Sequence, residues 1–298
     1  MSNVRVTPSG LLVVNKPCGM TSRAVVDHLQ RAAGGIKAGH AGTLDPLASG
    51  VLVLCVSKAT RLISYVQRMP KQYRATFLLG RRSPTEDIEA EVTLLDNPPV
   101  PTREQLCEAA RRLVGWVRQR PPAFSALKVA GRRAYDLARS GKPVDLKPRL
   151  VEIKALEIEA YDYPELRVRI ECGSGTYVRS VGRDMAICLG TDAVMCQLER
   201  TSVGAFRVED AVFLEQLTRE TWVEHLLPPL SAVSSLPRVE LTGDEVARVR
   251  KGQPIDNRTP FAEPRELAAV DSAGRLVAIL SHRGGGRLGP TLNLLEDG

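Results

Sequence analysis

The chain alternates short apolar runs with segments whose apolar residues recur at helical spacing. The runs at 11–15 (LLVVN) and 51–56 (VLVLCV) predict buried strands, because they are short, apolar and rich in valine. A helix is expected between them near 22–33, where the apolar residues share one face. After the second run, Ser57 is expected to cap a helix that continues through Tyr65.

The middle of the chain contains segments typical of half-buried strands. Residues 72–80, 151–159 and 166–172 predict three strands, and the last two alternate apolar and polar positions. A helix is expected at 176–189, with Gly190 as a natural stop. Together these segments predict a mixed α/β (α+β) fold with a largely antiparallel central sheet flanked by helices.

The pattern changes towards the end of the chain. A Pro- and Ser-rich linker is expected at 227–238, followed by short strands around one helix, for which Thr242 and Glu245 would form a capping box. We therefore predict two domains, a large one at 1–232 and a small β-rich one at 236–298.

The composition is that of an ordinary soluble globular protein. The 298 residues are 43% hydrophobic and 25% charged. No apolar run approaches the ~20 residues of a membrane span, and the first residues lack the basic-then-apolar pattern of a signal peptide. We expect a cytoplasmic protein without a membrane partner.

The cysteines and histidines do not predict a metal site. The six cysteines are widely spaced without a CxxC pair, and most lie in apolar patterns, so they are expected to be small buried hydrophobes. None of the four histidines is grouped with Cys or Asp at ligand spacing. Metal dependence is not expected.

Positive charge is concentrated in one segment. The chain carries a net charge of +7, yet residues 111–149 alone contain eleven Lys or Arg against two acids. Such an excess favours a polyanionic partner, although a solvated charged face is the simpler alternative. Residues 235–298 contain nine basic and nine acidic residues, so their charge gives no argument for such a partner.

Two residues of one glycine-framed loop could carry chemistry. Asp45 precedes the apolar run at 51–56, in a loop that would present its carboxylate where backbone can approach a ligand closely. Taken alone, however, the Asp-Pro pair more simply starts a turn. His40, in the same loop, is by itself most simply a surface imidazole.

Three further residues are ambiguous when considered one at a time. Tyr73 on its predicted strand and Leu198 are most simply core residues. Arg179 lies near the start of the helix expected at 176–189, where its charge opposes the helix dipole. A carboxylate partner would explain an arginine at that position.

The motifs become specific in combination. LLVVNKPCGMTS, GHAGTLDPLASGVL, KQYRATFLLGRRSPTEDIEAEV, RPPAFSALKVAGRRAYDLAR, CGSGTYVRSVGRDMAICLG and QLERTSVGAF occur in that order over residues 10 to about 217. This series closely resembles the TruB-type tRNA pseudouridine synthases, bacterial enzymes that act on the uridine at position 55 of tRNA. The resemblance implies the pseudouridine synthase fold and isomerisation of that T-loop uridine after base flipping, without a cofactor.

The same resemblance implies roles for individual residues. Asp45 would be the catalytic carboxylate, Tyr73 would lie against the target base, and Arg179 would pair with Asp45. An arm at about 118–149 would close over the T-arm, and a PUA-like module would follow at 236–298. The residues expected to bind substrate are Lys16, His40, Lys128, Arg132, Arg133, Tyr177 and Leu198.

The sequence leaves several alternatives open. A non-catalytic RNA-binding or RNA-folding protein could use the same basic arm, and a nucleobase glycosylase could use Asp45 to hydrolyse the same bond. For an isomerase, the sequence does not choose between a glycal route and covalent addition of the carboxylate. The tRNA T-arm is the expected partner, no protein partner is implied, and a monomer is expected.

Overall fold

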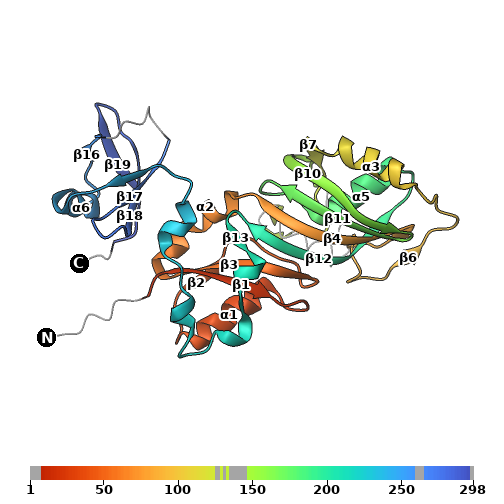
Figure 1. Cartoon of the computed structure of the whole chain (residues 1–298), viewed down its shortest axis with the longest axis horizontal. Coiled ribbons are helices and arrows are strands. Elements are labelled where there is room, and N and C mark those ends of the chain that lie inside the picture. The colour runs from red at the N-terminus through yellow and green to blue at the C-terminus, as the bar shows by residue number, and fades with distance from the viewer. Residues whose placement is uncertain (1–7, 125–127, 130–131, 134–145, 259–264, 296–298) are drawn as a thin grey trace.

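The computed structural model describes residues 8–124, 128–129, 132–133, 146–258 and 265–295. Figure 1 shows a large sheet with helices against it and a smaller sheet formed by the C-terminal part of the chain. The chain begins with β1 (Gly10–Lys16), α1 (Ser22–Ala32), β2 (Ala38–His40) and β3 (Ala48–Val56).

Among the described residues, ten strands form the large sheet, with the central order β14-β1-β3-β12-β4-β11-β10-β7. Of the strand pairs described in this sheet, only β1–β14 and β3–β12 are parallel, which confirms the predicted largely antiparallel sheet. The strands not yet introduced are β4 (Lys71–Leu79), β7 (Gly115–Gln119), β10 (Arg149–Asp162), β11 (Glu165–Cys172), β12 (Ala193–Val203), β13 (Phe206–Arg207) and β14 (Val212–Phe213).

Helices α3 (Arg103–Arg112) and α5 (Val178–Cys188) pack against β4, β10, β11 and β12 through one apolar cluster. Helix α1 buries its apolar face on β1 and β3 instead. The approach of α5 to the sheet requires a glycine, because a Cβ on Gly182 would lie 2.1 Å from the Phe77 ring. As predicted, this helix is followed by Gly190, whose φ is +70°.

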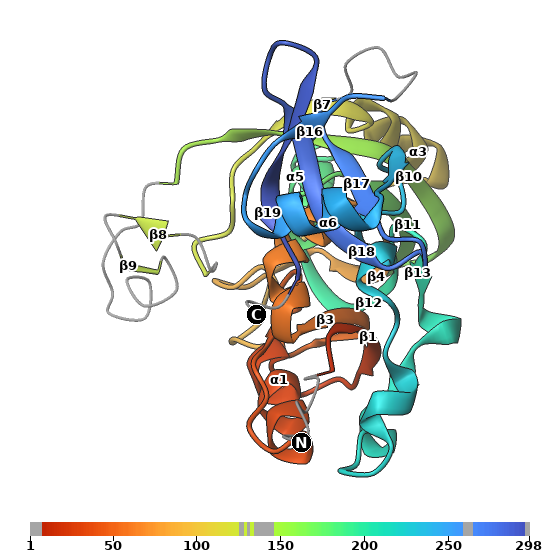
Figure 2. The same cartoon turned by 90° about the vertical axis from the view of Figure 1, so that its left-hand side faces the viewer.

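Two short hairpins form small sheets of their own. Strands β5 (Arg81–Arg82) and β6 (Thr93–Leu94) form one, and β8 (Lys128–Val129) and β9 (Arg132–Arg133) form the other. Figure 2 shows β8 and β9 projecting to one side of the main body. This projection belongs to the arm predicted at about 118–149, most of which lies outside the described residues.

The second sheet has the order β15-β17-β18-β19-β16 and carries one helix among the residues described there. Thr242 and Glu245 form both bonds of the predicted capping box at the start of that helix. The elements are β15 (Arg238–Glu240), α6 (Gly243–Arg250), β16 (Ile255–Asp256), β17 (Leu267–Val270), β18 (Leu276–His282) and β19 (Arg287–Asn293).

The segment between the sheets is packed rather than a free linker. Three short 3-10 helices occupy it after β14, and the backbones of Leu227 and Leu11 bond to each other. Ala232 and Val233 are buried in a cluster that also contains Ile279 of the second sheet. These 3-10 helices are η3 (Leu214–Gln216), η4 (Trp222–His225) and η5 (Pro229–Val233), while η2 (Val208–Asp210) lies between β13 and β14.

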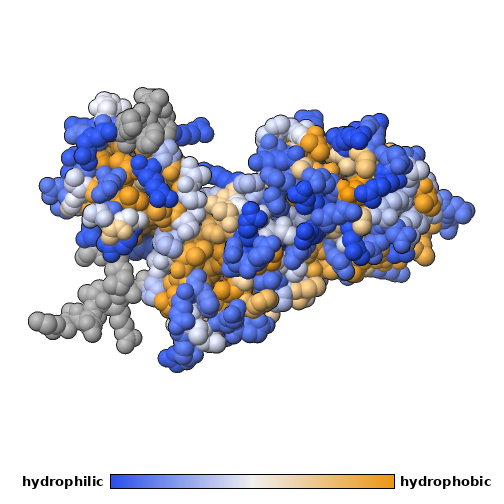
Figure 3. Space-filling view, viewed as in Figure 1, coloured by the Kyte–Doolittle hydropathy of each residue, from blue (hydrophilic) through white to orange (hydrophobic). Residues whose placement is uncertain are grey.

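The two sheets therefore share apolar contacts. Ile279 packs in the same cluster as Val53 of β3, and the Tyr65 hydroxyl donates a hydrogen bond of 2.7 Å to the Glu266 carboxylate beside β17. Figure 3 shows hydrophobic residues gathered low in the middle of the molecule, where Figure 1 draws β1, β2 and β3. The division into domains at 1–232 and 236–298 stays a prediction.

Ser57 does not cap the helix after β3, contrary to the prediction. Its φ is +53°, and a 3-10 helix, η1 (Ser57–Leu62), begins there with Val56 at the N-cap and without a side-chain cap bond. The sharp turn is fixed by the Ser57 amide, which donates to Lys37 O over 2.7 Å. Helix α2 (Ile63–Arg68) follows directly.

The expectation for the cysteines was only partly right. Cys55 and Cys172 are buried, but Cys18, in the turn after β1, and Cys188, the last residue of α5, are exposed. In the part of the chain that the structure describes, no helix is long and apolar enough to cross a membrane.

Candidate active site

The loop that carries Asp45 connects β2 to β3 and lies where β12 comes alongside β3. At that point Gly50 has a φ of +96°, and a Cβ there would lie 2.3 Å from the Arg200 carbonyl oxygen. Only glycine allows this approach. The Ser22 hydroxyl fixes the other side of the loop, since it donates to Leu44 O (3.0 Å) and accepts from Leu44 N (2.8 Å).

Lys16 joins the loop after β1 to the loop of Asp45. Its completely buried ammonium donates to three carbonyls, those of Pro17 (2.9 Å), Met20 (2.6 Å) and Pro46 (3.4 Å). Burial lowers the pKa of Lys16 to about 8. Pro46, which follows Asp45 in sequence, is thus held by Lys16, a residue that the sequence analysis expected to bind substrate.

Arg179 lies between two carboxylates. Its Nη2 is 3.0 Å from Asp45 Oδ2, and its Nη1 is 3.1 Å from Asp87 Oδ2. The guanidinium also donates to Thr85 O (2.8 Å) and to Phe124 O (3.0 Å). Four acceptors therefore fix the orientation of this buried arginine.

Asp45 is the more accessible of the two carboxylates. Its side chain is 34% exposed, whereas that of Asp87 is 1% exposed. Partial burial raises the pKa of Asp45 above its ordinary value, Arg179 opposes this rise, and the negative charge of Asp87 adds to it. Arg179 orients Asp45, but it does not cancel the whole rise in the pKa of Asp45 that burial causes.

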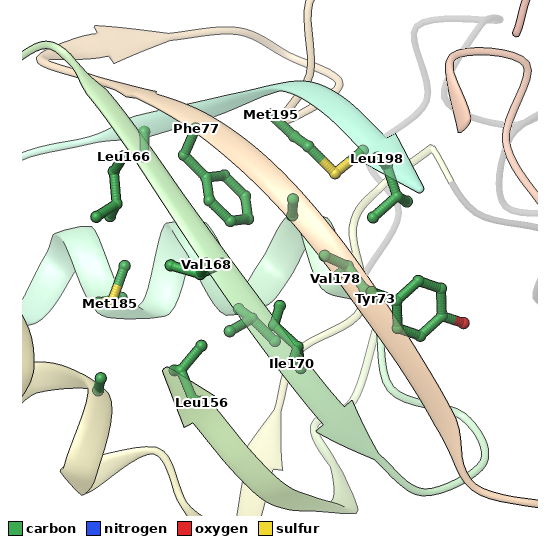
Figure 4. Packing of buried hydrophobic residues seen from close by; sticks show 14 of the residues in the cluster. Tyr73, Phe77, Leu156, Leu166, Val168, Ile170, Val178, Met185, Met195 and Leu198 are labelled. Atoms are coloured by element: carbon green, nitrogen blue, oxygen red, sulfur yellow. The ribbon is translucent and has the colours of Figure 1, made fainter. Parts of the chain in front are cut away.

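A cavity of about 300 Å³ opens beside Asp45. The residues that line it include Asp45, Tyr73, Arg179, Tyr177 and Leu198, which the sequence analysis had singled out separately. Figure 4 shows the labelled side chains of Tyr73 and Leu198 at the same end of the apolar cluster. The Tyr73 hydroxyl points away from the cluster.

Tyr73 is thus both a core residue and part of the cavity. It is 8% exposed, and its burial raises the pKa of the phenol. Tyr177, at the rim, is held through its backbone by the Gln119 amide, which accepts from Tyr177 N (2.8 Å) and donates to Tyr177 O (3.1 Å). The Arg149 guanidinium lies over the Tyr177 ring, 4.7 Å from its centre.

His40 lies on the other side of the Asp45 loop. It lines a second cavity, of about 1070 Å³, which Asp45 and Arg179 also line. The Nδ1 atom of His40 is buried without a hydrogen-bond partner among the described residues. Burial lowers the pKa of His40, so the imidazole is neutral at physiological pH.

Two charged residues of this site were not found from the sequence. Asp87 lies in an irregular segment without a periodic pattern that could mark it. Arg200 is almost fully buried and donates to Val51 O (2.7 Å), Gly42 O (3.2 Å) and Thr43 O (3.5 Å), so it braces the Asp45 loop from behind. A signal existed for Arg200, because it follows Leu198 at an inward-facing position of its strand.

The remaining predicted residues belong to the arm. Lys128 is paired with Arg133 in the β8–β9 hairpin, which also contains Arg132. Their side chains lie outside the description, as does most of the arm. Among the described residues there is no group of three or more His, Cys, Asp or Glu that could hold a metal ion.

The arrangement fits a flat, polar ring better than an extended chain. A carboxylate, an arginine and an aromatic ring meet at a cavity whose volume is at the lower end of the range for ligand sites. The apolar side chain of Leu198 and the ring of Tyr73 can contact a planar base. The Asp45 carboxylate can then reach the atoms at its edge.

Comparison with known proteins gives a consistent result. Residues 30–178 match the family model described as TruB family pseudouridylate synthase (N terminal domain). The chain is 42% identical over 291 residues to tRNA pseudouridine synthase B of Caulobacter sp. (strain K31), covering 93% of each chain. It is 40% identical over 290 residues to tRNA pseudouridine synthase B of Arthrobacter sp. (strain FB24), covering 93% of this chain and 94% of the relative.

Solved structures resemble the fold over nearly the whole chain. One is described as the structure of an H/ACA RNP bound to a substrate RNA containing 2'-deoxyuridine. It superposes with a TM-score of 0.75 at 21% identity, covering 97% of this chain and 86% of the other. Because the superposition covers 97% of this chain, it includes the second sheet as well as the large one.

Proposed function

The chain belongs to the TruB family of pseudouridine synthases, and from this premise we propose that it isomerises the uridine at position 55, in the T-loop of tRNA, to pseudouridine. The observation that carries the proposal is the Arg179–Asp45 pair at the cavity lined by Tyr73 and Leu198. The curated relatives, which match over more than nine tenths of both chains, support tRNA as the substrate.

Asp45 is the proposed catalytic carboxylate. Isomerisation breaks the bond from C1′ to N1 and forms a bond from C1′ to C5, while C5 loses a proton and N1 gains one. An ionised Asp45 can attack C1′ or C6, or stabilise charge as the glycosidic bond breaks. In the glycal route Asp45 is the base: it takes a proton from C2′ as the C1′–N1 bond breaks, and this proton returns to C2′ when C1′ bonds to C5, which then loses its own proton. Arg179 orients the carboxylate in each case.

Tyr73 is proposed to stack on the uracil. Because burial raises the pKa of this phenol, it stays protonated at neutral pH and is a poor base by itself. Its ring and the Leu198 side chain border the cavity together. This combination favours contact with the face of the base over proton abstraction.

A uridine in a folded T-loop must leave its stack before it can reach Asp45. Extrusion costs a few kcal/mol, and stacking on an aromatic ring returns ~1–3 kcal/mol per base. The neutral His40, which lines the second cavity, can stack and hydrogen-bond in the space that the base leaves. Asp45 lines both cavities, as this exchange requires.

The remaining assignments follow from the same proposal. Residues 1–232 form the catalytic domain, and the basic arm at about 118–149 closes over the T-arm through Lys128, Arg132 and Arg133. Residues 236–298 form a PUA-like module. The enzyme acts in the cytoplasm as a monomer without a cofactor.

The first test measures the reaction and its product together. Unmodified tRNA carrying tritium at C5 of uridine is incubated with the protein in EDTA, and tritium release and nucleoside composition are followed. We expect release with pseudouridine at position 55. Free uracil would instead indicate a glycosylase, and tight binding without release would indicate an RNA-binding protein, so either would overturn the proposal.

Asp45→Asn separates binding from chemistry. The variant keeps the size of the side chain, so it should bind T-arm RNA but turn over at least about a thousandfold more slowly, since it lacks the carboxylate. The matched control is Asp27→Asn, which removes a carboxylate from the exposed pair with Arg23 on α1. Near-normal turnover by Asp45→Asn would remove Asp45 from its proposed role.

A further inference from the structure

Lys71, the first residue of β4, is a buried lysine that the proposed chemistry has not used. It is 7% exposed, and it lines the cavity beside Asp45. Residues two apart on a strand point to the same side, so Lys71 shares its face of β4 with Tyr73. Figure 4 shows the Tyr73 hydroxyl pointing away from the apolar cluster. Lys71 therefore belongs to the same wall of the cavity as the ring proposed to contact the uracil.

The ammonium of Lys71 keeps one donor that its carbonyl partners do not use. It donates to Gln67 O and, over 2.7 Å, to Met69 O, which leaves one of its three N–H groups without an acceptor among the described residues. Lys16 differs, because it donates to three carbonyls and is not among the described residues that line this cavity. Lys16 is fully used in holding loops together, whereas Lys71 has a donor left for a ligand.

Nothing on the described elements around Lys71 balances its charge. No carboxylate there forms an ion pair with it, and burial keeps the pKa of the paired Cys172 thiol near 11, so that thiol is neutral. Burial lowers the pKa of Lys71 to about 8, and the positive charge of Arg200 adds to the effect. The amine is still mostly protonated at neutral pH. Two buried cations without a counterion fit a ligand that carries negative charge at this wall.

The isomerisation itself creates negative charge on the uracil. When the C1′–N1 bond breaks, its electron pair stays with the base, and the resulting anion spreads its charge over N1, O2 and O4. If Asp45 adds to C6 instead, the charge collects on O4 as an enolate. The uracil of the bound substrate is neutral before either step. A fixed cation at the wall would therefore stabilise the anion more than the substrate, which is the condition for catalysis.

A phosphate of the RNA is the other source of negative charge. Lys71 is as deeply buried as Tyr73, on the same face of the same strand, so a base in contact with the Tyr73 ring comes closest to it. Phosphates belong to the RNA backbone, which stays towards the rim. Arg149, which lies over the Tyr177 ring at that rim, is better placed for them. The position of Lys71 thus favours the base.

We propose that the Lys71 ammonium donates a hydrogen bond to O2 or O4 of the target uracil and stabilises the negative charge that forms on the base. Lys71 keeps its proton throughout. The electron pair released from the C1′–N1 bond is used when C5 bonds to C1′, after which C5 loses a proton and N1 gains one. The inference rests on the proposed function in taking uridine as the substrate. It holds for the glycal route and for covalent addition, because both place charge on the uracil oxygens.

Lys71→Met tests the charge, and a fluorinated substrate tests where the charge acts. Fluorine at C5 withdraws electrons and stabilises a uracil anion, so the reaction then depends less on an external cation. In single turnovers with saturating protein, Lys71→Met should convert uridine in the T-arm stem-loop about a hundredfold more slowly than wild type. With the fluorinated uridine at the same position, the defect should shrink to about tenfold. Nucleoside composition measures both rates, and the Kd for the RNA should be unchanged.

Lys16→Met is the matched control. Lys16 is also buried and its pKa is also lowered to about 8, but it acts through loops, so this variant should slow both substrates by the same factor. Lys71→Gln keeps N–H donors for Gln67 O and Met69 O without the charge and should behave like Lys71→Met. Lys71→Arg keeps the charge and should recover at least about tenfold of the rate lost with uridine. The three Lys71 variants keep the test available if one of them does not fold.

The outcomes separate this inference from the proposed function. With an active wild type, equal defects of Lys71→Met and Lys71→Gln on both substrates would make Lys71 a brace like Lys16 and overturn the inference alone. A higher Kd with a weaker salt dependence and normal turnover would place Lys71 on a phosphate and also overturn it. Wild-type protein that binds the RNA but converts neither substrate would overturn the proposed function, and the inference with it.

Discussion

At the scale of single residues, the site depends on how one guanidinium is shared. Arg179 contacts both Asp45 and Asp87, but Asp87 is buried and also accepts from Glu89 N (3.0 Å). Asp87 is therefore the fixed partner, and Asp45 is the one that faces the cavity. The shared arginine holds Asp45 in place while leaving part of its carboxylate exposed to substrate.

The raised pKa of Asp45 predicts how activity depends on pH. If the ionised carboxylate is the active form, the acid limb of kcat/KM lies above pH 3.8, the ordinary value for aspartate, and activity is lost as the pH falls through this limb. Asp87→Asn removes a negative charge that raises this pKa, so the limb should move to lower pH.

The same variant should lower kcat about tenfold or more, because Arg179 loses its fixed partner and orients Asp45 less well. Measuring kcat/KM against pH for wild type and Asp87→Asn tests both effects. Asp192→Asn, which breaks the surface pair with Arg82, is the control. An acid limb that moves to higher pH in Asp87→Asn would contradict this account of the site.

At the scale of elements, the contact of α5 with the sheet sets the position of Arg179. Gly182 lies one helical turn after this arginine and faces Phe77 of β4. A methyl group there would push the helix away from the strand, because the aromatic ring is buried and cannot move aside. The small residue thus fixes the distance between the helix and the cavity.

Gly182→Ala should therefore reduce the free energy of unfolding by ~1–3 kcal/mol, the usual cost of overpacking a core. It should also lower turnover, since Arg179 moves with the helix. Gly243→Ala is the matched control, because that helical glycine has open space around it and a negative φ. Urea unfolding of both variants checks the prediction, and equal stabilities would refute it.

At the scale of the whole molecule, the two sheets are coupled through an apolar cluster. Neighbouring residues of β18 face opposite ways: Ile279 packs in the cluster shared with β3, and Leu280 packs in the core of the second sheet itself. This alternation separates the contacts that hold the second sheet together from those that dock it on the first.

Substitution of either residue by alanine should lower the stability of the contact that this residue makes by ~2–5 kcal/mol. Ile279→Ala should loosen the docking and speed amide hydrogen exchange in η5 as well as β18. Leu280→Ala should speed exchange within the second sheet and leave η5 nearly unchanged. Identical exchange patterns for the two variants would show that the sheets are not coupled in this way.

Much of the architecture follows from the sequence, because local patterns encode it. Alternation and helical spacing placed the strands and helices, Thr242 and Glu245 marked a helix start, and Gly190 marked a helix end. Short-range periodicity indicates which face of a helix or strand is buried, and this can be predicted without knowing which element packs against that face. The motif series added the candidate residues, which no local pattern could distinguish from core or turn positions.

Other features were decided only by the tertiary structure. Asp87 as second partner of Arg179, Arg200 behind the Asp45 loop, and the packing of the segment before β15 on the large sheet join residues far apart in sequence. The pKa of Asp45 likewise depends on burial and on charges supplied by other elements. The physical reason is that burial and electrostatic interaction are properties of distances in space, whereas the sequence pattern records only which face of each element is turned inward.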